Sequence, residues 1–324
     1  MRLSRRLIEP AIIIAALSLA GAPASAQQQV ADSTYDTSVA KPAYTNTHPR
    51  VLFDEAHHNF HTTTGRYRPF AQLITNDGYR VTPNTKPFSA RTLDGYDVLV
   101  IANAAGEGWD SDSGVVKPAF MSDECDAVRD WVKAGGALLL IADHAPFGTS
   151  AANLAERLGV NMNTGYTIDS THADPEGKNP ANIVYSRANG LLRDHPITRG
   201  RDSTERISRI IAFTGQSLAG PAGSVAFMPL GDQALDLPLK TFANARSFKM
   251  ARSAATPAAG RAQGVAFGYS KGRVVMLGEA AMLSAQAIIG DDGKVMFRMG
   301  MNRPGIDNRQ IALNIMHWLS GALK

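Results

Sequence analysis

Polar side chains follow four predicted β-strands at the points where the strands end. Asp54 ends the first of these strands, Asn103 follows the second, Asp143 and His144 follow the third, and Glu279 follows the last. In open parallel sheets, ligands bind outside the carboxyl ends of the strands. We therefore expect these side chains to meet at one edge of a sheet and to form a polar site there.

Imidazole nitrogens and carboxylate oxygens are ligands that first-row divalent metals accept. Asp54, His58 and Asp143 are the predicted metal ligands, with Zn²⁺ as the first choice. A metal in such a site lowers the pKa of a bound water and polarises a carbonyl or phosphoryl oxygen. Without a metal, histidine and aspartate side chains could still act as an acid–base pair.

Glu55, His144 and Glu279 are the predicted catalytic groups, since a carboxylate or imidazole beside an activated water can serve as a general base. Together with a metal-bound water, they point to hydrolysis. Two other interpretations remain open: the same groups could bind a ligand without chemistry, or could cap helices and pair with one another.

Three further residues are predicted to contact a small-molecule substrate. Asn103 could steady developing negative charge, His61 belongs to the histidine-containing run after the first strand, and Trp109 could stack on a sugar or cover the edge of the core. Gly106 and Gly108 do not form a dinucleotide or phosphate-loop pattern, so no nucleotide cofactor is expected.

The loop over residues 167–182 carries two more polar groups, His172 and Asp174. They could reach over the site, although a solvated loop is the simpler expectation. His195 and His317 are interpreted as structural, the first in a turn and the second beside Trp318 in the last helix.

The elements that must position these groups alternate between strand and helix. Apolar runs predict strands over 50–54, 79–82, 97–102 and 137–142, and a hairpin from 264–269 and 273–278. Helical spacing predicts helices over 67–76, 122–134, 151–158 and 307–320. This order predicts an α/β fold with a doubly wound, mostly parallel, flavodoxin-like sheet, helices on both faces, and an irregular β-rich insertion over roughly 160–262.

The first 26 residues have the features of a cleavable export signal. Arg2, Arg5 and Arg6 precede a short apolar stretch, and Ala24-Ser25-Ala26 supplies the small residues that a signal peptidase needs. The expected cleavage follows Ala26, by the general secretory or the twin-arginine route, and the expected location is periplasmic or secreted. Residues 27–48 are predicted to be a flexible leader, and 49–324 a single domain.

Composition limits the range of partners. The formal net charge is +4 and falls to +2 without the signal, and no basic stripe predicts nucleic-acid binding. No later segment is apolar enough to predict stable membrane insertion. Cys125 is the only cysteine, so no intramolecular disulfide can form. The oligomeric state cannot be inferred from these features.

Several segments resemble the class I glutamine amidotransferase-like superfamily. They are Val51 to Glu55, Tyr96 to Ile101, Val132 to Ala142, His195 to Gly200, Gly272 to Glu279 and Asn308 to Leu319. The chain looks most like branches of this superfamily that are not amidotransferases: the trehalose-utilisation-type proteins and the domains related to gliding-motility transporter accessories and intraflagellar transport. The resemblance spans roughly 50–320 and implies the α/β architecture.

The amidotransferases carry a nucleophilic cysteine after the strand that ends here at Ala142, whereas this chain has Asp143 and His144 at that point. The resemblance therefore does not imply glutaminase activity. The polar site and the export signal favour an exported hydrolase-like enzyme acting on a small polar substrate, and the resemblance to trehalose-utilisation-type proteins suggests a carbohydrate-derived one. The alternative, which the resemblance also favours, is a periplasmic ligand-binding or interaction module without catalysis.

Overall fold

The structure is a computed structural model that describes residues 28–107, 116–176, 179–238 and 253–324. The predicted signal at 1–26 and Trp109 lie outside these residues.

A nine-stranded sheet lies at the centre of the described chain, with the path β3-β2-β4-β5-β15-β14-β10-β6 and with β11 paired to β14. The first five strands of this path run parallel, and β14 and β15 form the predicted antiparallel hairpin. The core strands are β2 (Arg50–Asp54), β3 (Arg80–Asn84), β4 (Val98–Ala102), β5 (Ala137–Ile141), β14 (Ala262–Tyr269) and β15 (Gly272–Leu277). A mixed α/β fold with a mostly parallel central sheet is therefore confirmed.

The central strands are buried on both faces, which explains their continuous apolar sequences. Successive side chains of a strand point to opposite faces, so β5 contributes Leu139 to one apolar core and Leu138 to the other. The sheet thus separates two cores, and each core needs its own cover of helices.

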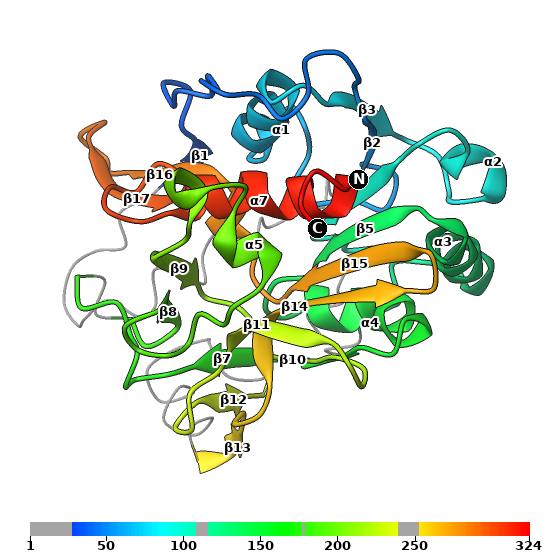
Figure 1. Ribbon diagram of the computed structural model, residues 1–324. Helices are drawn as coiled ribbons and strands as arrows, with labels where there is room; N and C mark the ends of the chain where they lie inside the picture. Colours follow the sequence, from blue (N-terminus) through cyan, green and yellow to red (C-terminus); the bar gives the residue numbers. More distant parts are fainter. Residues whose placement is uncertain (1–27, 108–115, 177–178, 239–252) are drawn as a thin grey trace, which may run out of the picture.

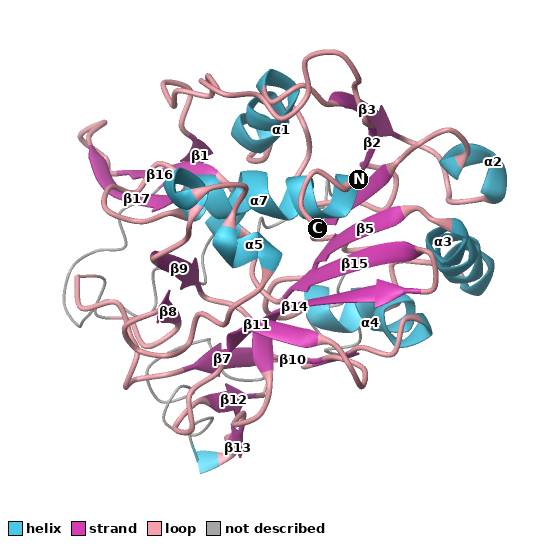
Figure 2. Ribbon diagram, viewed as in Figure 1, coloured by secondary structure: helices cyan, strands magenta, loops and turns pink. Residues whose placement is uncertain are grey.

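Helices cover both faces (Figure 2). The core that contains Leu139 is covered by α1 (Arg68–Asn76), α5 (Pro196–Arg199) and α7 (Asn308–Ser320). The core that contains Leu138 is covered by α2 (Ala90–Leu93), α3 (Ser122–Ala134) and α4 (Phe147–Arg157). None of the helices within the described ranges is both long and apolar enough to cross a bilayer.

The insertion contains the β-rich, irregular structure that was predicted. Its pieces β6 (Asn161–Met162), β10 (Leu218–Ala219) and β11 (Val225–Pro229) extend the central sheet. Separate small sheets are formed by β7 (Tyr166–Ile168), β12 (Leu235–Leu237) and β13 (Thr256–Pro257), and by β8 (Asn182–Ser186) with β9 (Arg209–Phe213). Two 3₁₀ turns complete the described elements, η3 (Ser203–Glu205) and η5 (Ala281–Leu283).

The prediction of a flexible leader over 27–48 is wrong for residues 28–48. Strand β1 (Gln28–Ala31) pairs with β16 (Ala285–Ile289), which pairs with β17 (Val295–Gly300), and Figure 1 shows these strands side by side. Tyr35 and Tyr44 pack against the apolar core, and the Tyr44 hydroxyl bonds with Ser320 at 2.9 Å. The aromatic side chains attach this segment to the core, although its polar composition predicts no such packing.

A substitution of Leu139 tests how much the central strand β5 contributes to the free energy of unfolding. Its side chain is fully buried, so Leu139→Ala is expected to lower the free energy of unfolding by about 2–5 kcal/mol through lost burial and a residual cavity. Val295→Ala is the control, because Val295 is 45% exposed and its truncation is expected to cost no more than about 0.5 kcal/mol. Urea unfolding of both variants measures the difference, and equal losses would contradict the assignment of the core.

Candidate functional site

Asp143 and Glu279 lie side by side at the carboxyl edge of the sheet. Strands β5 and β15 are parallel neighbours that pair Ile141 with Leu277, and the two acidic residues each follow two positions later. The charge of Asp143 contributes to the raised pKa of Glu279, which is consistent with two carboxyls close to each other. Both residues are buried.

Backbone N–H groups hold both carboxyls in place. Glu279 accepts hydrogen bonds from the N–H groups of Ala281 at 2.6 Å and Met282 at 2.8 Å. Asp143 accepts one from the N–H group of His144 at 2.7 Å. The Glu279 carboxyl thus binds the first two N–H groups of the turn η5, and these bonds fix the orientation of the carboxyl.

Burial makes these carboxyls unusually weak acids. It raises the pKa of Asp143 to about 8. Burial, followed by the negative charge of Asp143, raises the pKa of Glu279 well above its ordinary value. Within the described ranges neither carboxyl forms an ion pair, and the hydrogen bonds that they accept lower their pKa values less than burial raises them. The pair therefore retains protons at neutral pH and titrates as a unit.

Two tyrosines flank the carboxyl pair. The Tyr67 hydroxyl donates to the Ala280 carbonyl oxygen at 2.5 Å, and its pKa is raised by burial and then by the charges of Glu279 and Asp143. The Tyr185 hydroxyl donates to Gln263 Oε1 at 2.8 Å. Tyr67 immediately precedes α1 and Tyr185 lies on β8, so both the parallel core and the insertion contribute to the site.

The Gln263 amide reaches the same place. A Cβ atom added to Gly215 would lie 2.8 Å from Gln263 Nε2 and 2.9 Å from the Cβ of Glu279, so these two side chains converge on the backbone of Gly215. Gln263 Nε2 is buried and has no hydrogen-bond partner in the part of the chain that the structure describes.

An aspartate–histidine pair from the insertion extends this polar region. Asp169 is buried, and its Oδ2 lies 2.7 Å from His172 Nδ1. Its charge, like that of Glu279, raises the pKa of Tyr185, after the larger effect of burial. Gly231 lets the backbone approach this pair, since a Cβ there would lie 2.6 Å from Asp169 Oδ2.

The loop that carries His172 is packed, in contrast to the solvated loop expected from the sequence. Its Asp174 is fully buried and pairs with Arg303 at 2.6 Å. His195 and His317 are structural as predicted: His195 Nδ1 accepts the N–H of Ile197 at 3.2 Å, and His317 Nε2 lies 2.6 Å from Asp77 Oδ2.

Three other predicted residues lie around Asp143 and Tyr67. Asn103 has a φ of +52° and its Oδ1 accepts the Asp143 N–H at 3.0 Å. The His144 ring stacks on Tyr166 at 4.5 Å, and burial lowers its pKa to about 4. His61 stacks on Tyr67 at 4.6 Å, and burial followed by the charge of Arg66 lowers its pKa to about 3. Both imidazoles are therefore neutral.

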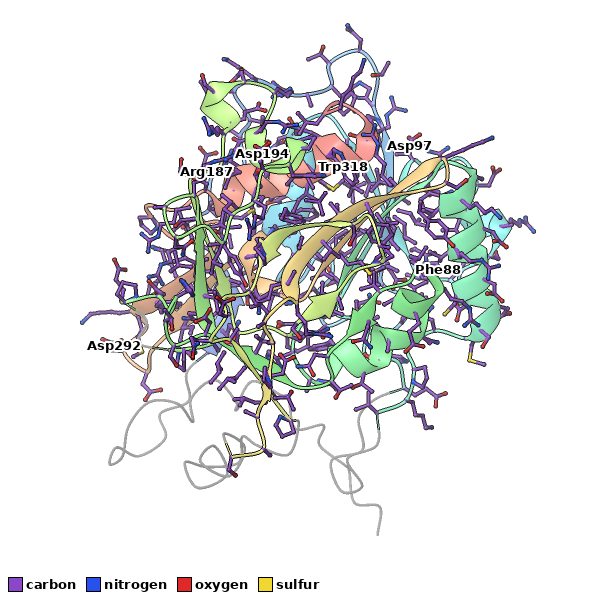
Figure 3. The ribbon with its side chains drawn as sticks, turned by 60° about the horizontal axis from the view of Figure 1, so that its bottom comes forward. Phe88, Asp97, Arg187, Asp194, Asp292 and Trp318 are labelled. Atoms are coloured by element: carbon purple, nitrogen blue, oxygen red, sulfur yellow. The ribbon has the colours of Figure 1, made fainter. Side chains whose placement is uncertain are left out.

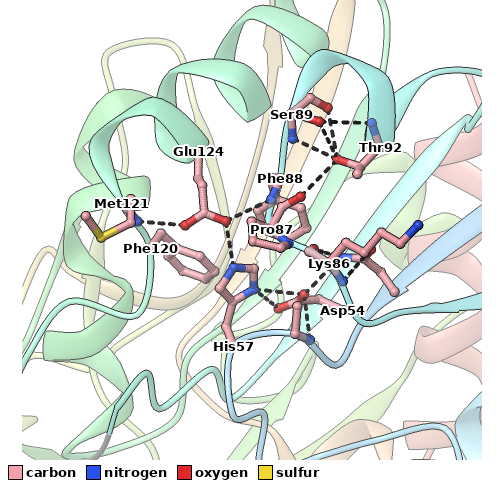
Figure 4. A network of polar contacts seen from close by, with 12 residues as sticks. Asp54, His57, Lys86, Pro87, Phe88, Ser89, Thr92, Phe120, Met121 and Glu124 are labelled. Carbon is pink, nitrogen blue, oxygen red and sulfur yellow. Dashed lines mark hydrogen bonds and ion pairs between the residues drawn. The ribbon is translucent and has the colours of Figure 1, made fainter.

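Asp54 belongs to a separate buried network (Figure 4). His57 Nδ1 lies 2.9 Å from both Asp54 oxygens, and His57 Nε2 lies 2.9 Å from Glu124 Oε1. Asn59 Nδ2 donates to Asp54 at 2.9 Å, and the Phe88 N–H donates to Glu124 at 2.8 Å. The network joins the end of β2 to the start of α3 and to the segment before α2.

Each nitrogen of His57 faces a carboxylate, which requires both to carry a proton. Burial alone would lower the pKa of His57, but its hydrogen bonds and charge interactions with Asp54 and Glu124 outweigh burial and raise it. Burial alone would raise the pKa of Glu124, but the Met121 N–H, His57 and the Phe88 N–H lower it. This network is an ion triad in which one cation lies between two carboxylates.

The predicted metal ligands do not form one group. Asp54 is held by His57, and His58 is exposed with a φ of +51°. Among the residues that the structure describes, no three histidine, cysteine, aspartate or glutamate side chains are placed to hold a metal ion. The donor set therefore does not fit the predicted metal. The predicted catalytic residue Glu55 also has local partners. Its Oε1 accepts hydrogen bonds from the backbone N–H and the hydroxyl of Thr63, both at 2.7 Å.

Several residues that the structure brings together are not among the site residues predicted from the sequence. His57 lies three residues after Asp54, a spacing that could have suggested the contact. Glu124 occupies the third position of α3, where a glutamate often caps the helix, and its Oε2 accepts the Met121 N–H at 2.9 Å. The contribution of Tyr67 and Gln263 depends on long-range packing, for which the sequence carries no signal.

The described geometry can be compared with known proteins. No family model matches the sequence, and no curated protein matches it either. The N-terminal domain of mmIFT52 superposes with a TM-score of 0.57 at 16% identity, over 83% of this chain and 97% of that domain. At this identity the likeness shows a shared fold alone.

Two further structures are similar over most of their length but superpose less well. A cytoplasmic protein from Salmonella typhimurium LT2 has a TM-score of 0.43 at 15% identity, over 83% of this chain and 99% of that one. A protein described as ThuA-like, from Bacteroides uniformis ATCC 8492, has a TM-score of 0.41 at 12% identity, over 87% of this chain and 93% of that one.

His57 is expected to be essential for stability. His57→Gln leaves the buried carboxylates of Asp54 and Glu124 without their shared cation, which is expected to cost about 3–5 kcal/mol of unfolding free energy. His58→Asn is the matched control, because this neighbour is exposed and asparagine tolerates its positive φ, so a change within about 0.5 kcal/mol is expected. Chemical denaturation measures both.

The His57 contribution should also depend on pH with a defined sign. Its folded-state pKa is raised above 6.5, so the contribution is complete below about that pH and is lost as pH rises through the folded pKa. The stability difference between wild type and His57→Gln should therefore shrink at alkaline pH. A difference that grows with rising pH would mean that His57 is neutral in the folded protein.

Proposed function

We propose that this protein is an exported hydrolase-like enzyme that acts on a small polar substrate through the carboxyl pair Asp143 and Glu279. The observation that carries the proposal is the position of two buried, uncompensated carboxyls on adjacent strand ends. Keeping such groups together opposes stability, and strongly perturbed carboxyls are characteristic of catalytic sites.

The pair offers an acid and a base within one unit. As the pH rises toward 8, one carboxyl of the pair ionises while the other keeps its proton. The protonated carboxyl then donates to a leaving group, and the ionised one accepts a proton from the attacking water. The raised pKa values keep a proton available near neutral pH. Gln263 Nε2 and the Tyr67 and Tyr185 phenols orient the substrate, and Asn103 holds the backbone of Asp143.

The class of protein is part of the proposal. The sheet order β3-β2-β4-β5-β15 supports a flavodoxin-like arrangement and a place among the non-amidotransferase branches of the glutamine amidotransferase-like superfamily. Cys125 cannot replace the missing nucleophile, because it is buried on α3 and burial raises its pKa to about 11. A carbohydrate-derived substrate rests on the sequence resemblance to trehalose-utilisation-type proteins.

No catalytic step is assigned to a metal, because the described residues do not offer a ligand set for one. A divalent metal stays a prediction from the sequence. Elemental analysis of protein purified without a histidine tag tests it, and stoichiometric zinc that persists in both Asp54→Ala and Asp143→Ala variants would point to ligands other than the predicted ones.

A ligand-binding or interaction module without catalysis is the second candidate function. It is favoured by the extent to which polar groups are already paired: Glu55 with Thr63, Asp54 with His57, and Glu279 with backbone N–H groups. Saturable binding of a small sugar without any turnover would support this function over hydrolysis.

Export is proposed from the signal-like segment over 1–26. Strand β1 begins at Gln28 and is paired along its length with β16, so a cleavage after Ala26 would leave the folded domain intact. Mass spectrometry of the secreted or periplasmic protein is expected to find Gln27 as the first residue. Intact Met1 in protein recovered from the cytoplasm alone would contradict export.

The carboxyl pair can be tested without knowing the substrate. Asp143 is expected to remain largely protonated at pH 7 and to titrate near pH 8. Infrared difference spectroscopy should therefore show a protonated carboxyl band that Asp143→Asn removes and Glu107→Gln, at an exposed position, retains. A titration near pH 4 would remove the basis of the proposed chemistry.

The same variant should reveal that function opposes stability at this position. A carboxyl whose folded pKa is raised leaves stability complete below its unfolded pKa and reduces it as pH rises through the folded value. Asp143→Asn should therefore be more stable than wild type at pH 8 and above, while losing hydrolysis of any substrate found in a panel of small glycosides and esters. An active Asp143→Asn variant would contradict the proposed role.

A further inference from the structure

A hollow of about 510 Å³ lies between the edge strand β3 and the short helix α2, outside the carboxyl pair described above. Its polar lining comes from one continuous stretch of chain that leads from the end of β3 to the start of β4. The residues that matter are Asn84, Thr85, Lys86, Arg91, Thr92 and Tyr96.

The charge of this hollow is positive. Lys86 and Arg91 line it, and no aspartate or glutamate does. Neither cation forms an ion pair among the described residues, whereas Arg201 pairs with Glu205 at 2.5 Å and Arg303 pairs with Asp174 at 2.6 Å. An anion that binds in the hollow could therefore contact both cations without breaking an existing ion pair.

A third cation stands beside the hollow. The guanidinium of Arg50 lies 4.7 Å from the centre of the Tyr96 ring, which forms part of the lining. The neighbouring acid, Asp97, accepts the backbone N–H of Arg50 at 2.7 Å and is not part of the lining. Two positive side chains thus line a hollow whose lining contains no carboxylate, and a third stacks on its tyrosine.

The backbone around the hollow is held by local hydrogen bonds. Asn84 Nδ2 donates to the Lys86 carbonyl oxygen at 2.7 Å, and Asn84 Oδ1 accepts the Lys86 N–H at 3.2 Å. Ser89 and Thr92 form a capping box at α2, with Thr92 Oγ1 accepting the Ser89 N–H at 2.7 Å. A preorganised wall lowers the entropy that a ligand must offset on binding.

We propose that this hollow binds the phosphate or sulfate group of a small molecule. Guanidinium and ammonium groups make charge-assisted hydrogen bonds to such oxyanions, and the Thr85 hydroxyl in the lining can add a neutral one. The residues that line this hollow include none of the side chains described around the carboxyl pair, so the site is independent of the proposed hydrolytic function.

Inorganic phosphate is the probe that tests the site. Titration followed by backbone amide NMR should give saturable shifts at residues 84–86 and 91–96, in a background of chloride at constant ionic strength. Lys86→Gln and Arg91→Gln are each expected to weaken binding by about tenfold or more, since each removes a charge-assisted contact. Both residues are exposed, so neither change should unfold the protein.

Lys294→Gln is the matched control. Lys294 is also an exposed lysine, but it pairs with Asp292 at 3.2 Å, and Figure 3 shows Asp292 at the opposite end of the molecule from Phe88, which precedes α2. This variant should bind phosphate as wild type does. Absent or unsaturable shifts, equal loss in Lys294→Gln, or unchanged affinity in both Lys86→Gln and Arg91→Gln would each overturn the proposal.

Discussion

The parallel pairing of β5 with β15 is the constraint on which the site depends. It aligns Ile141 with Leu277, so the two strands end level with each other, and Asp143 and Glu279 each follow two positions later. Hydrogen bonds along two buried strands fix this register, and a shift by one residue would exchange the side chains that pack into the two apolar cores. The energy of the core thus holds two carboxyls together that would otherwise separate.

The two buried acidic clusters illustrate opposite solutions to the same electrostatic problem. Asp54 and Glu124 share the imidazolium of His57, so their charges are partly compensated and the cluster connects three segments of the chain. Asp143 and Glu279 have no cation in the described part of the chain, and they respond by retaining protons. Compensation favours a structural role, and its absence favours chemistry.

The insertion contributes to the site and does not merely decorate the sheet. It provides Tyr185 on β8 and the Asp169–His172 pair, while Gln263 comes from the first part of β14. The parallel core with its carboxyl pair is a scaffold, and the groups that would contact a ligand come largely from β-rich segments around it. The shared fold with mmIFT52 therefore carries no statement about activity.

The sequence by itself determined the parallel strands, the helices α3 and α7, the β14–β15 hairpin and the strand-end position of Asp143 and Glu279. These features depend on local periodicity and on a general rule of sheet geometry, both of which are written in consecutive residues. Tertiary structure alone decided which polar groups meet. It brings His57 into contact with Glu124, 67 positions later in the chain, and it pairs Asp54 with His57 in place of the predicted metal. It also packs part of the 28–48 segment against β16 and the core. Such contacts depend on burial and on distances between segments far apart in the chain, for which a single sequence has no local pattern.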